Sequence, residues 1–152
     1  MTKKKHPTNA YCLLLLFLII TCINQQVLAQ CNLLPPSSAF TINGNAMSLG
    51  NNEYRLTENM SSQAGSIWYS NYLNLDQDFS LEFEVFLGTY DGGADGMAFV
   101  LQQSPQGTAA QSFGGGLGYK GISPSIAVEY DTWSNSDYGD PMTDHIAITK
   151  NG

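Results

Sequence analysis

Positive charge is scarce in this chain of 152 residues, and much of it lies at the amino end. Lys3, Lys4 and Lys5 are half of the six basic residues. From residue 30 onward, three basic residues stand against all thirteen acidic ones, which gives a formal charge of −10. This charge repels phosphate backbones and anionic lipid surfaces, so it disfavours nucleic acid and membranes as partners. It suits the binding of cations.

Cysteine and histidine are equally sparse, and this narrows the chemistry that the chain can perform. Of the three cysteines, only Cys31 lies beyond residue 30, so residues 30–152 hold no internal disulfide. Cys31 is left to pair with a partner molecule. His145 is the only histidine after residue 30. No Ser-His-Asp or Cys-His arrangement is apparent around it, so nucleophilic catalysis of that kind is not predicted.

Residues 1–29 have the pattern of a secretory signal peptide. The three lysines precede an apolar run from Tyr11 to Ile23, and Val27-Leu28-Ala29 offers a cleavage site. The run is shorter than the about 20 residues of a membrane-spanning helix, although a retained anchor is the alternative. Gln30 stands before Cys31 where lipoprotein processing needs a small residue. We expect secretion to the extracellular space or cell surface, with the periplasm as a second location.

Long helical patterns are also missing, and short segments of period two take their place. The clearest alternation lies in Ser80–Leu87, where the apolar residues share one face and the acidic residues the other. Further strands are predicted at Gly96–Gln102, Ser125–Asp131 and His145–Thr149, with weaker candidates at Glu53–Thr57 and Ser66–Ser70. Short strands joined by Gly-rich loops predict an all-β fold, an antiparallel β-sandwich or jelly roll.

Residues 30–152 are expected to form part of one domain. About 120 residues suffice for a single hydrophobic core. The last three residues, Lys150-Asn151-Gly152, place an Asn-Gly hairpin signal directly after a predicted strand. A hairpin turn implies a following strand, so we expect an incomplete sandwich whose remaining strands lie beyond residue 152.

The segment from Glu129 to His145 gathers groups that bind hard cations. Side chains alternate along the predicted strand Ser125–Asp131, so Glu129 and Asp131 share one face, while Ile126, Val128 and Tyr130 are expected to pack on the other. A loop then returns Asp140 toward His145, which begins the next strand. The carboxylates therefore converge at one end of two strands. The alternative is a solvated acidic loop with an ordinary surface histidine.

Two ligand sets can be drawn from this segment. One combines three carboxylates with an imidazole and suits Mn²⁺ or a similar transition ion; its members are Glu129, Asp131, Asp140 and His145. The other is entirely oxygen and suits Ca²⁺; it combines Asp131, Asn135 and Asp140 with a backbone carbonyl. Because two carboxylates belong to both sets, they are able to bridge two adjacent ions.

Three motifs, taken together, point to a known family. The pattern Glu-x-Asp-Thr-aromatic-x-Asn-x-x-x-x-Asp-Pro-x-x-x-His-Ile-x-Ile, from Glu129 onward, resembles the metal-binding segment of the L-type (legume-type) lectins. Ala94-Asp95-Gly96-Met97-Ala98-Phe99 resembles their Ala-Asp-Gly-aliphatic-Ala-Phe motif, and Gly114-Gly115-Gly116-Leu117-Gly118 resembles their Gly-rich sugar loop. The motifs stand in the family's order. The resemblance runs from about Ala64 to Ile148 and is that of a bacterial-like secreted member, truncated at its carboxyl end.

The resemblance implies metal-dependent carbohydrate binding without catalysis. Glu129, Asp131, Asp140 and His145 would hold the transition-metal ion, and Asp131, the carbonyl of Trp133, Asn135 and Asp140 would hold Ca²⁺. The metals would fix the sugar-binding residues without touching the sugar. The resemblance also implies a cis peptide bond between Ala94 and Asp95.

The resemblance assigns a second set of residues to the sugar. Asp95 and Asn135 would hydrogen-bond its hydroxyl groups, helped by a backbone N–H of Gly115 or Gly116. Trp133 would cover its C–H face. The partner would be a glycan on a glycoprotein or a polysaccharide, and a homodimer is left open.

Two other functions remain open from the residues alone. Glycoside hydrolases on related jelly rolls use a Glu-x-Asp-x-x-Glu pattern with two carboxyls flanking the bond. Glu129-Tyr130-Asp131 begins that pattern, but the second Glu is missing. The other alternative is a calcium-dependent adhesion module that does not bind sugar tightly. Asp95 and the glycine loop favour the lectin, because a structural calcium site does not require them.

Overall fold

The computed structural model describes residues 35–109 and 113–152. The predicted signal peptide and Cys31 lie outside these ranges. Within them, regular structure consists of antiparallel β-strands and short 3₁₀ turns, so the predicted all-β class is confirmed. No helix in the described ranges has the length and apolar character needed to cross a membrane.

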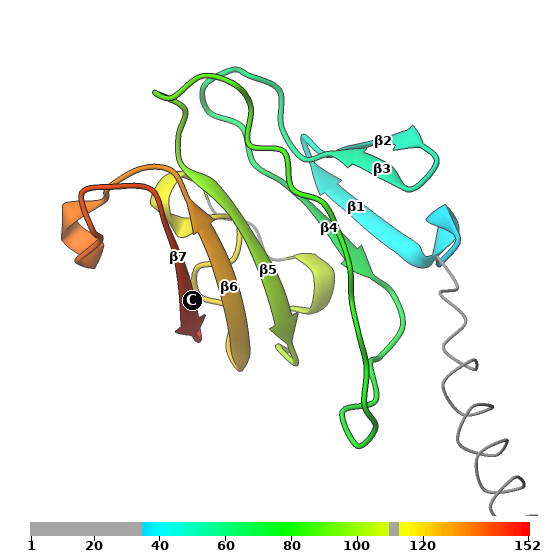
Figure 1. The fold of residues 1–152 in the computed structure, drawn as a ribbon. Helices are drawn as coiled ribbons and strands as arrows, with labels where there is room; N and C mark the ends of the chain where they lie inside the picture. The colour runs from blue at the N-terminus through cyan, green and yellow to red at the C-terminus, as the bar shows by residue number, and fades with distance from the viewer. Residues whose placement is uncertain (1–34, 110–112) are drawn as a thin grey trace, which may run out of the picture. The chain divides into compact units, whose positions relative to one another are not determined.

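The principal sheet has three strands that lie side by side in Figure 1, in the order β5-β6-β7. They are β5 (Gly96–Gln102), β6 (Ser125–Asp131) and β7 (His145–Lys150). β5 and β6 have the predicted bounds, and β7 runs one residue beyond its prediction. Asp131 pairs with Gly96 on one side and with His145 on the other. One end of the sheet is therefore a single row of three residues from three strands.

Two smaller antiparallel pairs precede this sheet along the chain. β1 (Phe40–Gly44) pairs with β4 (Gly65–Tyr69), and β2 (Met47–Gly50) pairs with β3 (Glu53–Arg55). The weaker predictions at Glu53–Thr57 and Ser66–Ser70 correspond to β3 and β4. Strands β1 and β2 were not predicted, because they are short and carry Asn and Gly. Asn51 and Asn52 join β2 to β3 with φ of 50° and 60°, the left-handed backbone that a two-residue hairpin turn requires.

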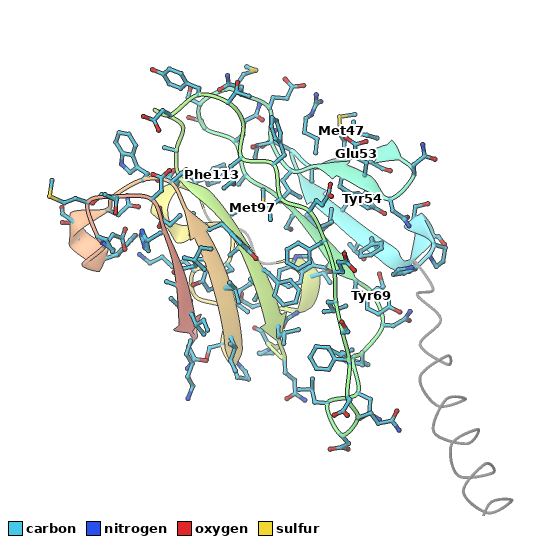
Figure 2. All side chains as sticks on the ribbon, viewed as in Figure 1. Met47, Glu53, Tyr54, Tyr69, Met97 and Phe113 are labelled. Carbon is cyan, nitrogen blue, oxygen red and sulfur yellow. The ribbon has the colours of Figure 1, made fainter. Side chains whose placement is uncertain are left out.

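Aromatic rings connect the two small pairs. The ring centroid of Phe40, in β1, lies 5.4 Å from that of Tyr54 and 5.6 Å from that of Tyr69. Tyr54 belongs to β3 and Tyr69 to β4, and both are labelled in Figure 2. Because tilted aromatic pairs at this separation attract, the three rings hold β3 against the β1–β4 pair.

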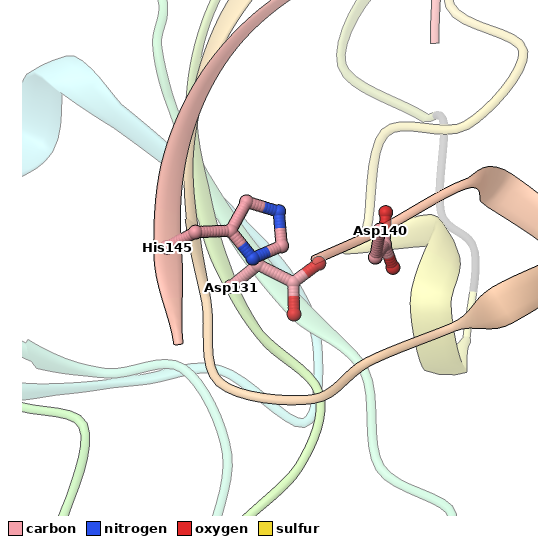
Figure 3. A group of neighbouring side chains, drawn as sticks. All are labelled: Asp131, Asp140 and His145. Carbon is pink, nitrogen blue, oxygen red and sulfur yellow. The ribbon is translucent and has the colours of Figure 1, made fainter. Parts of the chain in front are cut away.

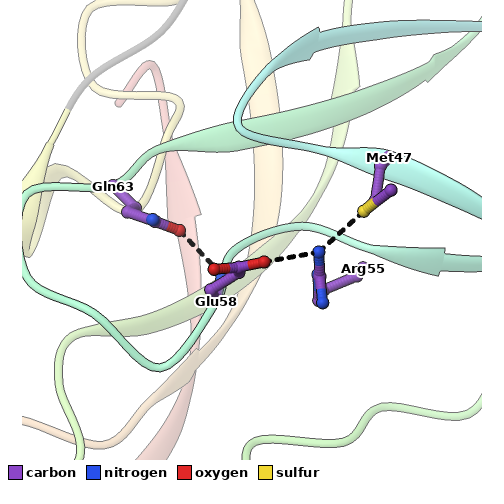
Figure 4. Close-up of polar contacts among 4 residues, drawn as sticks. All are labelled: Met47, Arg55, Glu58 and Gln63. Atoms are coloured by element: carbon purple, nitrogen blue, oxygen red, sulfur yellow. Dashed lines mark hydrogen bonds and ion pairs between the residues drawn. The ribbon is translucent and has the colours of Figure 1, made fainter.

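Polar contacts fasten the end of β3 to the loop that follows it (Figure 4). Arg55 Nη2 lies 2.7 Å from a Glu58 carboxylate oxygen and 2.7 Å from the sulfur of Met47. The Glu58 backbone N–H donates to the side-chain oxygen of Gln63. The ion pair is about half exposed, so solvent screens it and its contribution to stability is small. Its role is to set the path of the loop.

The predicted strand at Ser80–Leu87 is wrong, because this segment forms no ladder with another strand in the described ranges. Its apolar alternation is real, and the ring of Phe83 stacks on Phe99 of β5 with centroids 5.3 Å apart. Leu81 and Leu87, on the apolar face, nevertheless remain 52% and 43% exposed. A strand needs backbone donors and acceptors on a neighbour, and alternation alone does not supply them.

The core lies on one face of β6. Tyr119, Ile122 and Ala127 are buried together, and Trp68, Ala98, Val100 and Leu117 pack against them. The opposite face is open: Ile126 is 55% exposed, and Ile146 and Ile148 of β7 are exposed too. The alternation predicted for β6 is confirmed, but the expectation that Ile126 packs in a core is wrong within the described ranges.

We predict that truncating Ile122 is far more damaging than the same change at Ile126. Ile122 is fully buried, so Ile122→Ala removes core contacts and leaves a cavity, at a cost of about 2–5 kcal/mol in the free energy of unfolding. Ile126→Ala, at a residue more than half exposed, is the matched control. Urea denaturation followed by tryptophan fluorescence measures both. Equal losses of stability in the two variants would contradict the assignment of the core to the face of β6 opposite Ile126.

Candidate functional site

A group of metal-ligating side chains stands at the end of the principal sheet. Asp131, Asp140 and His145 each offer a ligand atom, and these atoms lie within 4.8 Å of one another (Figure 3). Asp131 ends β6 and His145 begins β7, and their direct pairing brings them together. Asp140 arrives from the connecting loop. Three of the four residues predicted to bind a transition-metal ion are therefore gathered here.

The loop between β6 and β7 is folded around its own carboxylates. Asp131 is 4% exposed, and its Oδ1 accepts the backbone N–H of Trp133 at 2.8 Å. Asp140 Oδ2 accepts the backbone N–H of Asn135 at 2.8 Å. Between them lies the turn η4 (Ser136–Tyr138), which Gly139 ends with a left-handed φ of 80°. Each carboxylate therefore uses one oxygen to shape the loop.

The imidazole of His145 is oriented by a backbone acceptor. Its Nδ1 lies 3.2 Å from the carbonyl oxygen of Thr143. A carbonyl only accepts hydrogen bonds, so Nδ1 carries the proton when this bond forms. Nε2 then has the lone pair that a metal takes.

Glu129, the fourth predicted ligand, lies outside this group of three. It shares the buried face of β6 with Asp131, as alternation requires. Its Oε1 accepts a hydrogen bond from the Tyr119 hydroxyl at 2.5 Å. Burial, together with this bond to a carboxylate, raises the pKa of Tyr119 to about 12, so the phenol is protonated at neutral pH and donates. The sequence did not reveal this role for Tyr119, because only the fold brings its hydroxyl to Glu129, ten residues further along the chain.

The residues predicted to bind sugar converge beside the carboxylates. Asp95 directly precedes β5, and its backbone carbonyl accepts the N–H of Thr132, at 2.9 Å. The side chain of Asn135 interacts with the Asp95 carboxylate and lowers the pKa of that group, against the effect of burial. The Ala94–Asp95 peptide bond is cis, which confirms the expectation drawn from the resemblance.

The glycine loop closes over this pair. A Cβ built on Gly114 would lie 3.8 Å from Asp95 Oδ2, and one built on Gly115 would lie 2.5 Å from Asn135 Oδ1. The same Cβ on Gly115 would lie 2.8 Å from the ring of Tyr138. Glycine is therefore needed at position 115 because the amide and the ring press against the backbone. This contact of Tyr138, like the bond of Tyr119, was not predicted.

One atom of this site is buried and unsatisfied. Asn135 Oδ1 is without a hydrogen-bond partner in the described part of the chain. Burying a carbonyl oxygen without a partner costs about 1–3 kcal/mol, so such an atom calls for a ligand. Like the carboxylates of Asp131 and Asp140, an amide oxygen is a ligand atom of the kind that Ca²⁺ prefers. The types of ligand atom present therefore fit a calcium ion.

The Asp95 carboxylate is disfavoured as an anion by its surroundings. Burial is the largest cause that raises its pKa, and the charge of Asp131 adds to it, while the hydrogen bond from Asn135 opposes both. The folded protein therefore holds a proton on Asp95 more tightly than the unfolded chain does. A cation near Asp131 would remove part of the repulsion.

Comparison with known proteins agrees with this geometry. Residues 31–152 match the family described as "Legume lectin beta-barrel domain". The chain belongs to the legume lectin family. Its fold class is accordingly the antiparallel jelly-roll sandwich of that family, as predicted.

Individual relatives match a smaller part of this chain than the family does. The "Galactose-binding lectin" of Arachis hypogaea is 33% identical over 129 residues, which are 74% of this chain and 46% of that protein. "Lectin-4" of Griffonia simplicifolia is 38% identical over 82 residues, 48% of this chain and 33% of its own length. The "Pesticidal crystal protein Cry22Aa" of Bacillus thuringiensis is 38% identical over 98 residues, 64% of this chain and 13% of that protein. The chain thus spans less than half the length of each of these relatives.

We predict that Asp95→Asn stabilises the metal-free protein at neutral pH. Because the folded-state pKa of Asp95 is raised, its contribution to stability is present at low pH and is lost as pH rises through that pKa. The amide is never charged, so the variant should exceed the wild type in urea midpoint at pH 7 in chelator. The gain should vanish near pH 3, below the ordinary value of 3.8. A difference independent of pH would contradict the assigned electrostatics.

Proposed function

We propose that this chain is a secreted lectin that binds carbohydrate reversibly, with Ca²⁺ and Mn²⁺ as structural ions, and without catalysis. Support comes from one observation above all: the side chain of Asn135 interacts with the Asp95 carboxylate, and the amide oxygen of the same residue is buried without a partner in the described part of the chain. The amide of Asn135 would thus serve both the sugar-binding group and the cation that we propose.

The ion assignments follow from the chemistry of the donors. Ca²⁺ would take oxygens of Asp131, Asn135 and Asp140 with the backbone carbonyl of Trp133. Mn²⁺ would take Asp131 and Asp140 with His145 Nε2 and the carboxylate of Glu129. When bound, the ions neutralise the carboxylates and hold the loop in place. They supply no step of a reaction.

Recognition of the sugar is assigned to this chain's own groups. The Asp95 carboxylate would accept from two neighbouring hydroxyl groups, and the Asn135 amide N–H would donate to one of them. We assign the backbone donor to Gly115, because Gly116 is buried and its N–H already donates to Phe113. Trp133, which is 50% exposed, would cover the C–H face of the ring.

We predict that removing either the ions or the Asp95 carboxylate abolishes glycan binding. The full chain is applied to a glycan array with Ca²⁺ and Mn²⁺ and again with chelator. Asp95→Asn tests the carboxylate, and Asp78→Asn, the same change at an exposed position outside the site, is the matched control. Binding that survives both chelation and Asp95→Asn would sink the proposed site.

The same preparation separates the proposed lectin from the other functions. Release of reducing ends from a polysaccharide, lost in Glu129→Gln, would identify a hydrolase instead. Retention of calcium with no glycan bound on the array would identify an adhesion module.

We predict that Gly115→Ala eliminates glycan binding although it adds one methyl group. The new Cβ would displace the Asn135 amide and the Tyr138 ring, and a shift near 1 Å in the amide would break the proposed coordination of the ion by its oxygen and the proposed hydrogen bond of its N–H to the sugar. Gly118→Ala is the control, because its φ of 78° strains alanine while no atom lies within 4 Å of the new Cβ. It should cost stability of about 1 kcal/mol and preserve binding. Equal glycan affinity in the wild type and Gly115→Ala would refute the close packing.

A further inference from the structure

We propose that Tyr119 and Thr149 are positioning residues that present the Glu129 carboxylate to the transition-metal ion. The inference rests on the proposed function, because it takes Glu129 as a ligand of that ion. It assigns a task to two residues that neither the motifs nor the ligand sets contain.

The three side chains form a directed chain of hydrogen bonds. Tyr119 has one hydroxyl proton and donates it to Glu129 Oε1 at 2.5 Å. Its oxygen therefore accepts the second bond, in which the hydroxyl of Thr149 is the donor. A carboxylate has two oxygens, so Glu129 is able to bind Tyr119 with one and a cation with the other.

Glu129 needs such support because its neighbours along the sheet are small. Its register partners are Ala98 on β5 and Ala147 on β7, whose methyl side chains leave its long side chain room to change rotamer. Thr149 follows Ala147 on the same face of β7, directly opposite Ala127. The hydroxyl of Tyr119 contacts both Glu129 and Thr149 on this face. It is thus a contact that restricts where the Glu129 carboxylate points.

Tyr119 is itself held firmly. It is 3% exposed and belongs to the core with Ile122. Its N–H donates to the carbonyl of Gly116, and its carbonyl accepts the N–H of Ile122, both at 3.0 Å. The phenol therefore projects from a rigid turn that is continuous with the glycine loop.

Residues that orient metal ligands commonly change metal affinity by about 10–100-fold when they are removed. Tyr119→Phe keeps the buried ring and deletes only the hydroxyl. The proposed Ca²⁺ set does not include Glu129, so loss of the hydroxyl should weaken Mn²⁺ and largely spare Ca²⁺. A general loosening of the fold would weaken both ions together.

The experiment measures Mn²⁺ and Ca²⁺ binding separately, by calorimetric titration of chelator-stripped full chain. We expect Tyr119→Phe to weaken Mn²⁺ binding about 10-fold or more. Thr149→Val should weaken it less, and Thr149→Ser should restore it because the hydroxyl returns. Tyr72→Phe, which deletes the hydroxyl of a fully exposed residue outside the site, is the matched control and should bind as the wild type does. With Co²⁺ in place of Mn²⁺, the visible absorption of Tyr119→Phe should shift, since a displaced carboxylate alters the coordination.

The outcomes separate this inference from the proposed function. A wild type that binds neither Mn²⁺ nor Co²⁺ would overturn the transition-metal site and this inference with it. A wild type that binds Mn²⁺, with Tyr119→Phe and Thr149→Val binding it equally well, would overturn the positioning role alone. An equal loss of both ions in Tyr119→Phe, without recovery in Thr149→Ser, would also overturn it.

Discussion

The pairing of Asp131 with Gly96 and His145 is the constraint on which the rest of the site depends. Side chains on a strand alternate with a period of two, so a slip of one residue would turn His145 to the opposite face of the sheet. The backbone ladder of β5, β6 and β7 therefore determines which candidate metal-binding side chains lie side by side. The same backbone hydrogen bonds thus stabilise the sheet and fix the geometry of the site.

The loops position the residues of the site that lie outside the strands. The β6–β7 connection folds around Asp131 and Asp140 by accepting backbone N–H groups, so it has its path before any ion is bound. The glycine loop then approaches Asn135 closely, because it carries no side chain at Gly115. Ordered backbone thus brings two carboxylates and an imidazole together, and a cation would relieve the repulsion between the two carboxylates.

Sequence reasoning succeeded where the pattern had a physical cause within a few residues. The bounds of β5 and β6, and the placing of Asp131 and His145 at adjacent strand ends, follow from alternation and spacing. It failed where the cause lay elsewhere in the chain. Ser80–Leu87 alternates well but finds no ladder partner in the described ranges, and β1 and β2 form despite weak patterns because they pair with β4 and β3. Tyr119 was missed for the same reason: only the fold reveals that its hydroxyl meets Glu129.

Gly96 illustrates how fold and ligand binding can be inherited separately. Its φ is 134°, and a Cβ there would lie 2.2 Å from the carbonyl oxygen of Tyr130, so the backbone itself demands glycine. Asp95, its neighbour, meets no such demand from the sheet. In a relative without the proposed sugar site, position 95 would be free to change, whereas position 96 would still require glycine. A relative that keeps the glycine but replaces the aspartate would therefore be expected to keep the fold without the proposed sugar site. A relative that replaces the glycine would be expected to have a changed backbone at this end of β5.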